Sequence, residues 1–244
     1  MCGIVGVSGI DQAAELVSLG LYALQHRGQE AAGICAVNGD AAHVHKADGL
    51  VAEGFDDAVL ARLPGRTALG HTRYSTTGGP GLVNAQPLVV SYHQGDLALV
   101  HNGNITNARV LRDELVREGA LFQSGTDSEV IIHLIARSRR PTPDEQIRDA
   151  LGRLVGAFSL LITVGDVLYA ARDPWGIRPL ILGRLDGGHV LASETCALDL
   201  VGAKVVRELA PGELLSIEGG RITELPGLDV APQPAPCIFE LIYF

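Results

Sequence analysis

The hydrophobic positions of this chain change their period several times along its length. The N-terminal run "GIVGVS", residues 3–8, has the short β-branched composition of a strand. Apolar residues then recur at helical spacing, at Ala14, Val17, Leu21 and Leu24. This spacing predicts an amphipathic helix, with Asp11 as its N-cap and Gly28 at its end.

Two strand-like runs follow and are separated by a turn signal. They are "AAGICAV" (residues 31–37) and "AHVHKA" (residues 42–47), with Asn38 and Gly39 between them. An Asn-Gly pair between two such runs predicts a β-hairpin. The segments "TALGHTRY" and "DLALVHNG" predict two further strands, each followed by a glycine-rich or polar loop.

Helical and extended patterns then come in separate blocks. Helical spacing covers residues 107–120, 126–138 and 143–156. Four strand-like runs follow in quick succession, at residues 157–164, 167–173, 179–185 and 189–194. Strands joined by short turns, with helices in blocks between them, favour mainly antiparallel sheets covered by helices. The expected fold class is therefore α+β, arranged in layers.

Composition and charge narrow the functional classes. The 244 residues are 47% hydrophobic, which suffices for a sizeable core and excludes general disorder. The formal net charge of −9 leaves no basic footprint, so we expect no nucleic-acid partner. The longest apolar stretches fall far short of the roughly 20 residues that a membrane span needs, and the N-terminus lacks the pattern of a signal peptide. These features predict a cytoplasmic protein with no membrane partner.

The cysteines and histidines form no metal-site pattern. The four cysteines are widely separated, at positions 2, 35, 196 and 237, and form no CxxC pair. This spacing argues against a zinc site and against a disulfide framework, and it fits a reducing compartment. His43 and His45 would share one face of a strand, as metal ligands sometimes do, but no third ligand is evident. We therefore expect no bound metal.

Cys2 directly follows the initiator methionine in the opening "MCGIVGV", and its position allows two interpretations. It could be a small apolar residue packed beneath the first strand, because free cysteines are usually buried and inert. Alternatively, removal of Met1 would leave Cys2 with both a thiol and a free α-amine. A nucleophile and a base would then share one residue.

Four polar loops carry other residues suited to chemistry, in "LQHRGQE", "HTRYSTTGG", "HNGN" and "SGTDSE". Sites are commonly built at strand ends and helix starts, but each of these motifs alone is weakly specific. The Asn-Gly pair of "HNGN" is also typical of a turn. Asp127 could be an acid of a first helical turn, and Arg73 could be a surface ion-pair partner.

Taken together, the motifs are more specific. "MCGIVG", "HRGQEAAGI", "HTRYSTTG", "HNGNITN" and "SGTDSE", in this order and spacing, resemble the class II glutamine amidotransferases of the N-terminal nucleophile hydrolase superfamily. The resemblance covers nearly the whole chain, and "HRGQE" points within that class to the amidophosphoribosyltransferase family. It implies a four-layer αββα sandwich of two mainly antiparallel sheets flanked by helices. That architecture agrees with the blocks of strands and helices described above.

The resemblance implies a catalytic set for hydrolysis of the glutamine side-chain amide. Cys2 would be the nucleophile, and its α-amine would accept the thiol proton and return one to the departing ammonia. The side-chain amide of Asn102 and the backbone N–H of Gly103 would bind the tetrahedral oxyanion. The γ-glutamyl thioester on Cys2 would then be hydrolysed to glutamate.

The resemblance also implies how glutamine would be held. The planar guanidinium of Arg73 would bind the α-carboxylate, and Asp127 would pair with the α-ammonium. Arg27 and Gly28 resemble family residues beside the nucleophile and are expected to shape its pocket.

The same resemblance implies a domain organisation. Residues 2–230 would form the glutamine amidotransferase domain, and residues 231–244, which open with "APQPAP", would start a linker or the next domain. In the full enzyme a phosphoribosyltransferase domain follows and receives the ammonia, and this chain carries no motif of that domain. We expect no cofactor in this chain, Mg²⁺ only with that second domain, and a homo-oligomer in the full-length form. The resemblance places the family at the first committed step of purine synthesis.

Cys237 lies where some family members place an iron–sulfur ligand. Because no companion cysteines are present, we expect no cluster.

Two other classes of function stay open from the sequence. One is a stand-alone regulatory module that binds glutamine without turnover, and the complete set of implied residues argues against it. The other is an amidohydrolase of the same superfamily that cleaves a non-glutamine amide. The Arg73 and Asp127 pair argues against that second class, because it suits a free α-amino acid.

Overall fold

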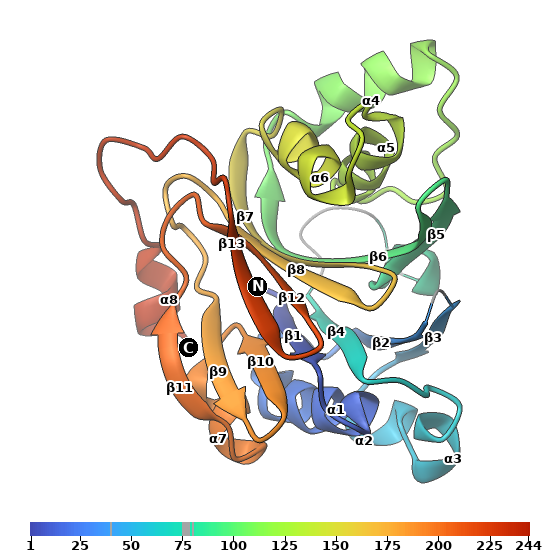
Figure 1. Cartoon of the computed structure of the whole chain (residues 1–244), viewed down its shortest axis with the longest axis vertical. Coiled ribbons are helices and arrows are strands. Elements are labelled where there is room, and N and C mark those ends of the chain that lie inside the picture. Colours follow the sequence, from blue (N-terminus) through green and yellow to red (C-terminus); the bar gives the residue numbers. More distant parts are fainter. Residues whose placement is uncertain (40, 75–78, 80) are drawn as a thin grey trace.

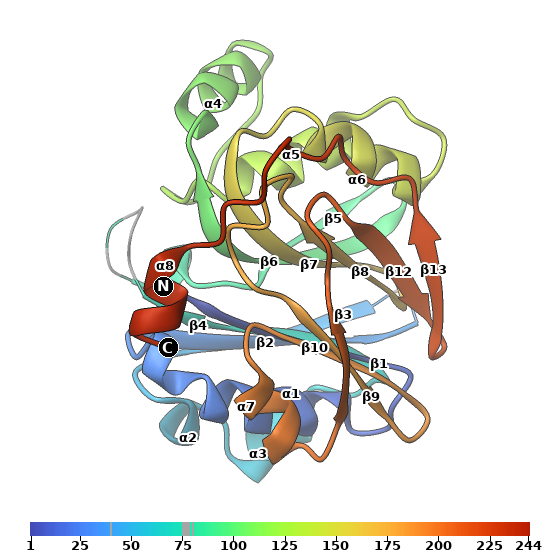
Figure 2. The ribbon, with the colours of Figure 1, turned by 90° about the vertical axis from the view of Figure 1, so that its left-hand side faces the viewer.

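Two antiparallel β-sheets lie face to face, and helices cover the outer face of each, as Figure 1 and Figure 2 show. The computed structural model describes residues 1–39, 41–74, 79 and 81–244. The four layers confirm the expected αββα sandwich and the α+β class.

The first sheet carries the N-terminal strand near its centre. In the described chain it has seven strands, in the order β11 (Lys204–Glu208), β9 (Ile181–Leu185), β10 (Gly188–Ala192), β1 (Gly3–Ser8), β4 (Thr67–Arg73), β2 (Ala31–Asn38) and β3 (Ala41–Asp48). The helices of its outer layer are α1 (Ala13–Ala23), α2 (Val51–Gly54), α3 (Asp57–Leu60) and α7 (Thr195–Leu200). Apolar residues of α1, such as Val17 and Leu21, pack against this sheet in one buried cluster.

The second sheet stacks on the first. Its six described strands follow the order β13 (Arg221–Leu225), β12 (Leu214–Glu218), β8 (Val167–Arg172), β7 (Gly156–Val164), β6 (Gly95–Ile105) and β5 (Leu88–Tyr92). Its outer layer consists of α4 (Ala108–Arg117), α5 (Glu129–Arg137) and α6 (Pro143–Leu151). The side chain of Thr142 caps α6 by accepting a hydrogen bond from the backbone N–H of Glu145 at 3.3 Å.

The core between the sheets orients the site. It includes Ile4 of β1, Leu69 of β4 and Val100 of β6, all fully buried. Side chains alternate between the two faces of a strand, so every second residue counted from these three also faces the opposite sheet. These rows lead towards the strand ends where the predicted site residues lie.

Most predicted elements are confirmed, with shifts at their ends. The first helix starts at Ala13 after Gln12, whose φ is 59°, and no side chain caps it. The prediction of Asp11 as N-cap is therefore wrong; its carboxylate pairs with Arg66 at 3.0 Å instead. The helix also ends before Gly28, because the 3-10 turn η1 (Gln25–Arg27) intervenes.

The predicted hairpin is confirmed, with the turn one residue later than expected. Asn38 is still part of β2 and pairs with Ala41 of β3. Gly39 follows with a φ of 64°, a left-handed conformation that favours glycine.

The prediction that a strand ends at "HNG" is wrong. β6 continues to Ile105, and both residues of the Asn-Gly pair lie in the ladder, where Asn102 pairs with Ser159 and Gly103 with Phe158 of β7. The pair is therefore not a turn. Four short strands, β5, β11, β12 and β13, were not predicted, although β9 and β10, which are equally short, were.

The C-terminal segment lies against the domain. Residues 231–237 run beside residues 174–177, with three backbone hydrogen bonds of 2.8–3.1 Å, and α8 (Ile238–Ile242) follows. In Figure 2 this helix lies beside the N-terminus. The boundary at residue 230 stays a prediction. None of the helices that the structure describes is long and apolar enough to cross a membrane.

Candidate functional site

Three predicted site residues lie an even number of residues from the inter-sheet core residues Ile4, Leu69 and Val100, so their side chains face the opposite sheet. Cys2 directly precedes β1, Arg73 is the last residue of β4, and Asn102 lies near the end of β6. Cys2 and Arg73 lie at the same end of two neighbouring strands, because Gly3 of β1 is paired with Thr72 of β4. The alternation of strand side chains thus brings residues from three distant motifs to one place.

The thiol of Cys2 lies 3.6 Å from the backbone carbonyl of Tyr74, to which it donates a hydrogen bond. Burial raises the pKa of this thiol, while the nearby N-terminal amine and the Arg27 guanidinium act in the opposite direction. Burial lowers the pKa of the N-terminal amine of Met1. This amine belongs to Met1 and is not the α-amine that Cys2 would carry after removal of Met1.

Arg27 contacts the main chain of Cys2, and Gly28 packs against the main chain of Arg73. The fully buried Arg27 donates from Nε to the backbone carbonyl of Cys2 at 2.9 Å. A Cβ on Gly28 would lie 2.5 Å from the backbone carbon of Arg73, so only glycine allows this close approach of η1 to β4. That these two residues shape the pocket of Cys2 stays a prediction.

Arg73 is 4% exposed, so it is not a surface ion-pair partner. Its Nη2 donates to the carbonyl of Gly79 at 2.8 Å, and its Nη1 donates to that of Gly81 at 3.1 Å. No carboxylate of the described residues lies within ion-pair distance of this guanidinium. A buried cation that lacks an anionic partner is suited to binding a carboxylate ligand. The rest of the predicted "HTRYSTTGG" loop, residues 75–78, lies outside the described residues.

Asn102 and Gly103 provide donors at the end of β6. The side chain of Asn102 is 1% exposed, and its Nδ2 has no hydrogen-bond partner among the described groups. At Gly103 an added Cβ would lie 2.1 Å from the carbonyl oxygen of Ala157, so a side chain has no room there. Buried amides are rarely left unpaired, so the Asn102 amide is available to a ligand.

Asp127 lies two residues before α5, so it is not in the first helical turn. Its Oδ2 accepts a hydrogen bond from the backbone N–H of Ile105 at 2.8 Å. Its Oδ1 accepts only a longer bond of 3.4 Å from the hydroxyl of Ser128. One carboxylate oxygen is thus fixed to β6, and the other has capacity for a further donor.

Four of the predicted residues line one pocket, which we call the Cys2 pocket. Its lining residues are Cys2, His71, Arg73, Tyr74, Asn84, Gln86, His101, Gly103, Thr126, Asp127 and Ser128. The predicted residues Asn102, Arg27 and Gly28 are not among the lining residues. The pocket has about 30 Å³ of free volume.

The sequence analysis did not single out two histidines that line the Cys2 pocket. His101 contacts the hydroxyl of Ser128 through Nδ1 at 2.9 Å, and burial lowers its pKa. Both ring nitrogens of His71 are buried without a partner among the described groups. Burial, with His101 and Arg73 nearby, lowers the pKa of His71 to about 3, so the ring is neutral. Both residues belong to quoted motifs, "HTRY" and "HNGN", which was the available signal.

Asn84 and Gln86 were also missed, and both are nearly buried. Asn84 donates from Nδ2 to the carbonyl of Gly79 at 2.7 Å, and Gln86 accepts from the backbone N–H of His101 at 2.6 Å. They lie in the turn η2 (Leu82–Asn84) and just after it, where no periodic pattern marks them.

The remaining cysteines and histidines do not form a second centre. All four cysteines are described and free. Burial raises the pKa of Cys35 to about 12. The ring of His45 meets that of Phe55 edge-on at 5.4 Å. Within the described residues no group of three His, Cys, Asp or Glu side chains is arranged to hold a metal ion.

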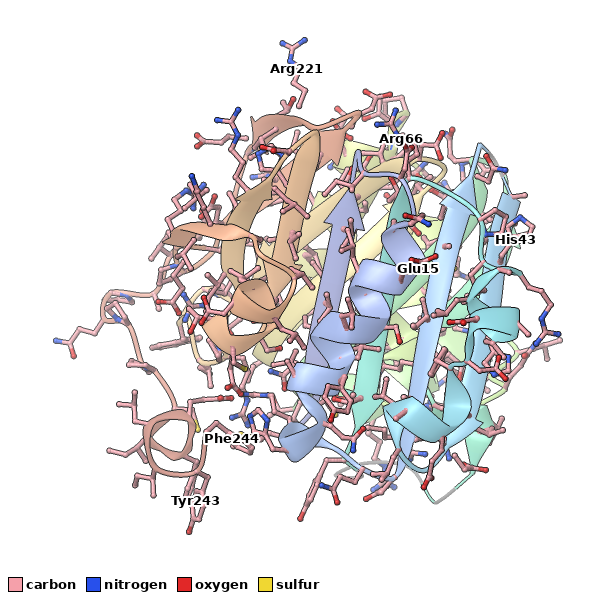
Figure 3. The ribbon with its side chains drawn as sticks, turned by 90° about the horizontal axis from the view of Figure 1, so that it is seen from below. Glu15, His43, Arg66, Arg221, Tyr243 and Phe244 are labelled. Carbon is pink, nitrogen blue, oxygen red and sulfur yellow. The ribbon has the colours of Figure 1, made fainter. Side chains whose placement is uncertain are left out.

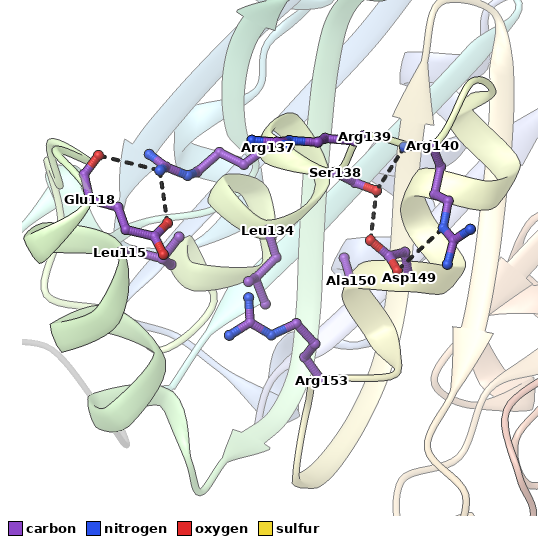
Figure 4. A pocket seen from close by; sticks show the side chains of 10 residues that line it. All are labelled: Leu115, Glu118, Leu134, Arg137, Ser138, Arg139, Arg140, Asp149, Ala150 and Arg153. Carbon is purple, nitrogen blue, oxygen red and sulfur yellow. Dashed lines mark hydrogen bonds and ion pairs between the residues drawn. The ribbon is translucent and has the colours of Figure 1, made fainter.

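A larger cavity, of about 510 Å³, lies among α4, α5 and α6 (Figure 4). Three of its four guanidinium groups pair with carboxylates: Arg137 with Glu118 at 2.8 Å, Arg140 with Asp149 at 3.6 Å and Arg153 with Glu114 at 2.6 Å. It contains none of the predicted site residues. The Cys2 pocket is therefore the better candidate, although it is smaller.

Comparison with known proteins agrees with the geometry. A family model described as a glutamine amidotransferase domain matches residues 71–200. Amidophosphoribosyltransferases from Rhizobium etli and Bacillus subtilis are 46% and 43% identical over 100% of this chain, which covers 50% and 51% of their lengths. The solved structure of the glutamine phosphoribosylpyrophosphate amidotransferase from B. subtilis, complexed with ADP and GMP, matches 99% of this chain and 52% of its own with a TM-score of 0.93 and 41% identity. The chain thus spans about half the length of the curated relatives it matches.

Proposed function

The chain belongs to the glutamine amidotransferase family, and from this premise we propose that it hydrolyses the side-chain amide of glutamine to glutamate and ammonia. In this proposal Cys2 is the nucleophile, and removal of Met1 gives it the free α-amine. The amine accepts the thiol proton, and the sulfur attacks the amide carbon. Collapse of the tetrahedral intermediate breaks the carbon–nitrogen bond, and the proton leaves with ammonia. Water then hydrolyses the thioester and regenerates the thiol.

The observation that carries the proposal is the unpartnered amide of Asn102. Its Nδ2 is buried near the end of β6. The next residue of that strand, Gly103, lines the pocket together with Cys2. Donors held in place before the reaction stabilise an oxyanion most effectively, since they do not reorganise during it. A purely structural asparagine would satisfy its own amide.

The charged groups of the pocket support glutamine as the substrate. Arg73 has only carbonyl partners among the described residues, and Asp127 retains one lightly used oxygen. A cation and an anion that line one pocket suit the carboxylate and ammonium of a free α-amino acid. Arg27 completes the proposed site by holding the main chain of Cys2, and Gly28 does so by allowing the close approach to the main chain of Arg73.

The curated relatives are about twice as long as this chain, and the proposal extends to a whole protein of that length. Ammonia from this chain would pass to a phosphoribosyltransferase domain, in the first committed step of purine synthesis. That second domain would bring the need for Mg²⁺, and the full-length protein would form a homo-oligomer. A reducing cytoplasmic setting belongs to the same proposal and is supported by four free cysteines.

The test measures glutamate release from glutamine by the purified chain, together with labelling by a diazoketone analogue of glutamine. We expect turnover, a single adduct on Cys2 of a chain without Met1, and loss of both in Cys2→Ala. Glutamine binding without glutamate release would indicate a regulatory module. Hydrolysis of a different amide in preference to glutamine would indicate another amidohydrolase, and an adduct on Cys35, Cys196 or Cys237 would refute the assignment of the nucleophile.

A further inference from the structure

An ion-pair network connects the last helix to the main chain of Cys2. Glu240 of α8 accepts hydrogen bonds from Arg27 Nη2 at 2.9 Å and from Arg178 Nη1 at 3.1 Å. Arg27 in turn donates from Nε to the Cys2 carbonyl at 2.9 Å. One carboxylate therefore holds the guanidinium group that holds the nucleophile.

The network is buried. The Arg27 side chain is 0% exposed and that of Glu240 is 10% exposed. On its other side Arg27 pairs with Glu194 at 2.6 Å. A buried guanidinium needs its anionic partners, because loss of one leaves an uncompensated charge in a region of low dielectric.

The helix itself is not held by apolar burial. Ile238, Leu241 and Ile242 of α8 are between 62% and 79% exposed, whereas Glu240 points into the protein. Phe244, just beyond the helix, lies under the Arg27 guanidinium with 4.5 Å between the guanidinium carbon and the ring centroid. Figure 3 shows Phe244 turned towards the end of α1 and Tyr243 turned away. The side chains of α8 and Phe244 thus contact the domain at Arg27, Arg178 and His26.

We propose that Glu240 is a positioning residue for the nucleophile: it holds Arg27 against the carbonyl of Cys2, so that the placement of α8 determines the placement of Cys2. The proposal rests on the proposed function in taking Cys2 as the nucleophile. Glu240 does not line the Cys2 pocket, so it acts through Arg27 and leaves glutamine binding by Arg73 and Asp127 intact.

The test compares Glu240→Ala with Glu240→Gln in the full chain. Loss of the Glu240 contact lets the main chain of Cys2 move, and a misplacement of about 1 Å costs about a hundredfold in rate. We expect kcat for glutamine hydrolysis to fall about ten- to hundredfold in Glu240→Ala, with KM within about twofold of the wild type. Glu240→Gln retains an acceptor of the same size and should restore part of kcat.

Glu213→Ala is the matched control. Glu213 is 14% exposed and pairs with Arg207 at 2.5 Å, far along the chain from the Cys2 motifs. It should lose thermal stability as Glu240→Ala does, but it should keep kcat. Equal kcat values for Glu240→Ala and Glu213→Ala would overturn the proposal.

A second readout does not require turnover. The charged and titratable groups around Cys2 are the N-terminal amine, Arg27, Arg73, Asp127, His71 and His101, with Glu240 and Arg178 behind them. Glu240→Gln leaves Arg27 in place with less of its charge compensated, which favours the thiolate. The pH midpoint of Cys2 alkylation by iodoacetamide, followed by mass spectrometry, should therefore move to lower pH in Glu240→Gln and stay unchanged in Glu213→Gln.

An unchanged midpoint in Glu240→Gln would overturn the proposal even if Glu240→Ala fails to fold. If the wild-type chain releases no glutamate, the proposed function fails, and the midpoint still reports whether Glu240 acts on Cys2 through Arg27.

Discussion

The carboxylate of Asp127 accepts a hydrogen bond from the backbone N–H of Ile105 at 2.8 Å, two residues beyond Gly103. This bond fixes the segment before α5 to the end of β6. The proposed group for the α-ammonium and the proposed oxyanion donors are therefore parts of one rigid unit. Substrate placement and transition-state stabilisation depend on the same contact.

The Asp127→Asn variant separates these two roles. The amide oxygen can still accept from Ile105, but the negative charge that would pair with the α-ammonium is lost. A hydrogen bond to a charged group contributes about 1.5–3 kcal/mol, so KM for glutamine should rise about 10- to 100-fold with little change in kcat. Steady-state kinetics check this, with Asp149→Asn in the larger cavity among α4, α5 and α6 as a control. A fall in kcat at constant KM would assign Asp127 to the structure of β6 instead.

The Arg73→Lys variant tests recognition of the carboxylate. An ammonium cannot reproduce the two parallel donors of a guanidinium, and its shorter donor array would also lose one of the bonds to Gly79 and Gly81. We expect KM for glutamine to rise about tenfold or more while kcat changes less. Competition by glutamate and by glutaramide, which lacks the α-carboxylate, gives the matched measurement. Equal loss of affinity for both compounds would contradict a carboxylate contact.

The Asn102→Ala variant tests the oxyanion donor. Removal of one such donor costs about 3–4 kcal/mol of transition-state stabilisation, so kcat should fall about 100- to 1000-fold with a smaller change in KM. Stability should not fall with it, because the Nδ2 atom has no partner to lose. Parallel thermal melts check that point. A kcat within about threefold of the wild type would remove the main support for the proposed function.

The residue pattern was sufficient to predict the layers and most of the long elements. Helix α5 and strands β7 and β8 have strong periodicity, and the structure places them where the sequence does. Helix ends were less predictable. The backbone of Gln12 adopts a left-handed conformation without a side-chain cap, so the capping preference of Asp11 was misleading.

The residues of the site could be predicted from the family resemblance but not from hydrophobic periodicity. Asn102 and Gly103 look like a turn in isolation, yet pairing with β7 keeps them extended, which is a tertiary effect. Asn84 and Glu240 contact residues that are distant in sequence, Gly125 and Arg27, and no local pattern marks such partners. Resemblance supplied the roles of Cys2 and Asp127, whereas the network behind Cys2 required coordinates.

The Gly103→Ala variant should destabilise the chain as well as the site. A Cβ there would lie 2.1 Å from the Ala157 carbonyl oxygen and 2.6 Å from His101 Nε2, so β6 and β7 would have to separate locally. Overpacking of this kind typically costs about 1–3 kcal/mol in the free energy of unfolding. Gly152→Ala is the control, since its Cβ would meet nothing closer than 3.5 Å. Urea unfolding of both variants measures the difference, and equal stabilities would show that the β6–β7 pairing adapts.

The last prediction concerns the dependence of stability on pH through His71. Burial lowers the pKa of this ring to about 3 in the folded chain, whereas the unfolded value is about 6.5. Between these values the unfolded chain binds one more proton than the folded chain, so the free energy of unfolding falls as pH decreases from about 6.5 towards 3, by up to about 1.4 kcal/mol per pH unit. The pKa of His101 is shifted in the same direction and adds to the slope.

In His71→Leu the contribution of one proton to this slope should disappear. Stability at pH 7 should change little, because neither ring nitrogen has a partner to lose. Urea unfolding of the wild type and of His71→Leu between pH 7 and pH 5 measures both slopes, and identical slopes would mean that His71 is protonated in the folded chain.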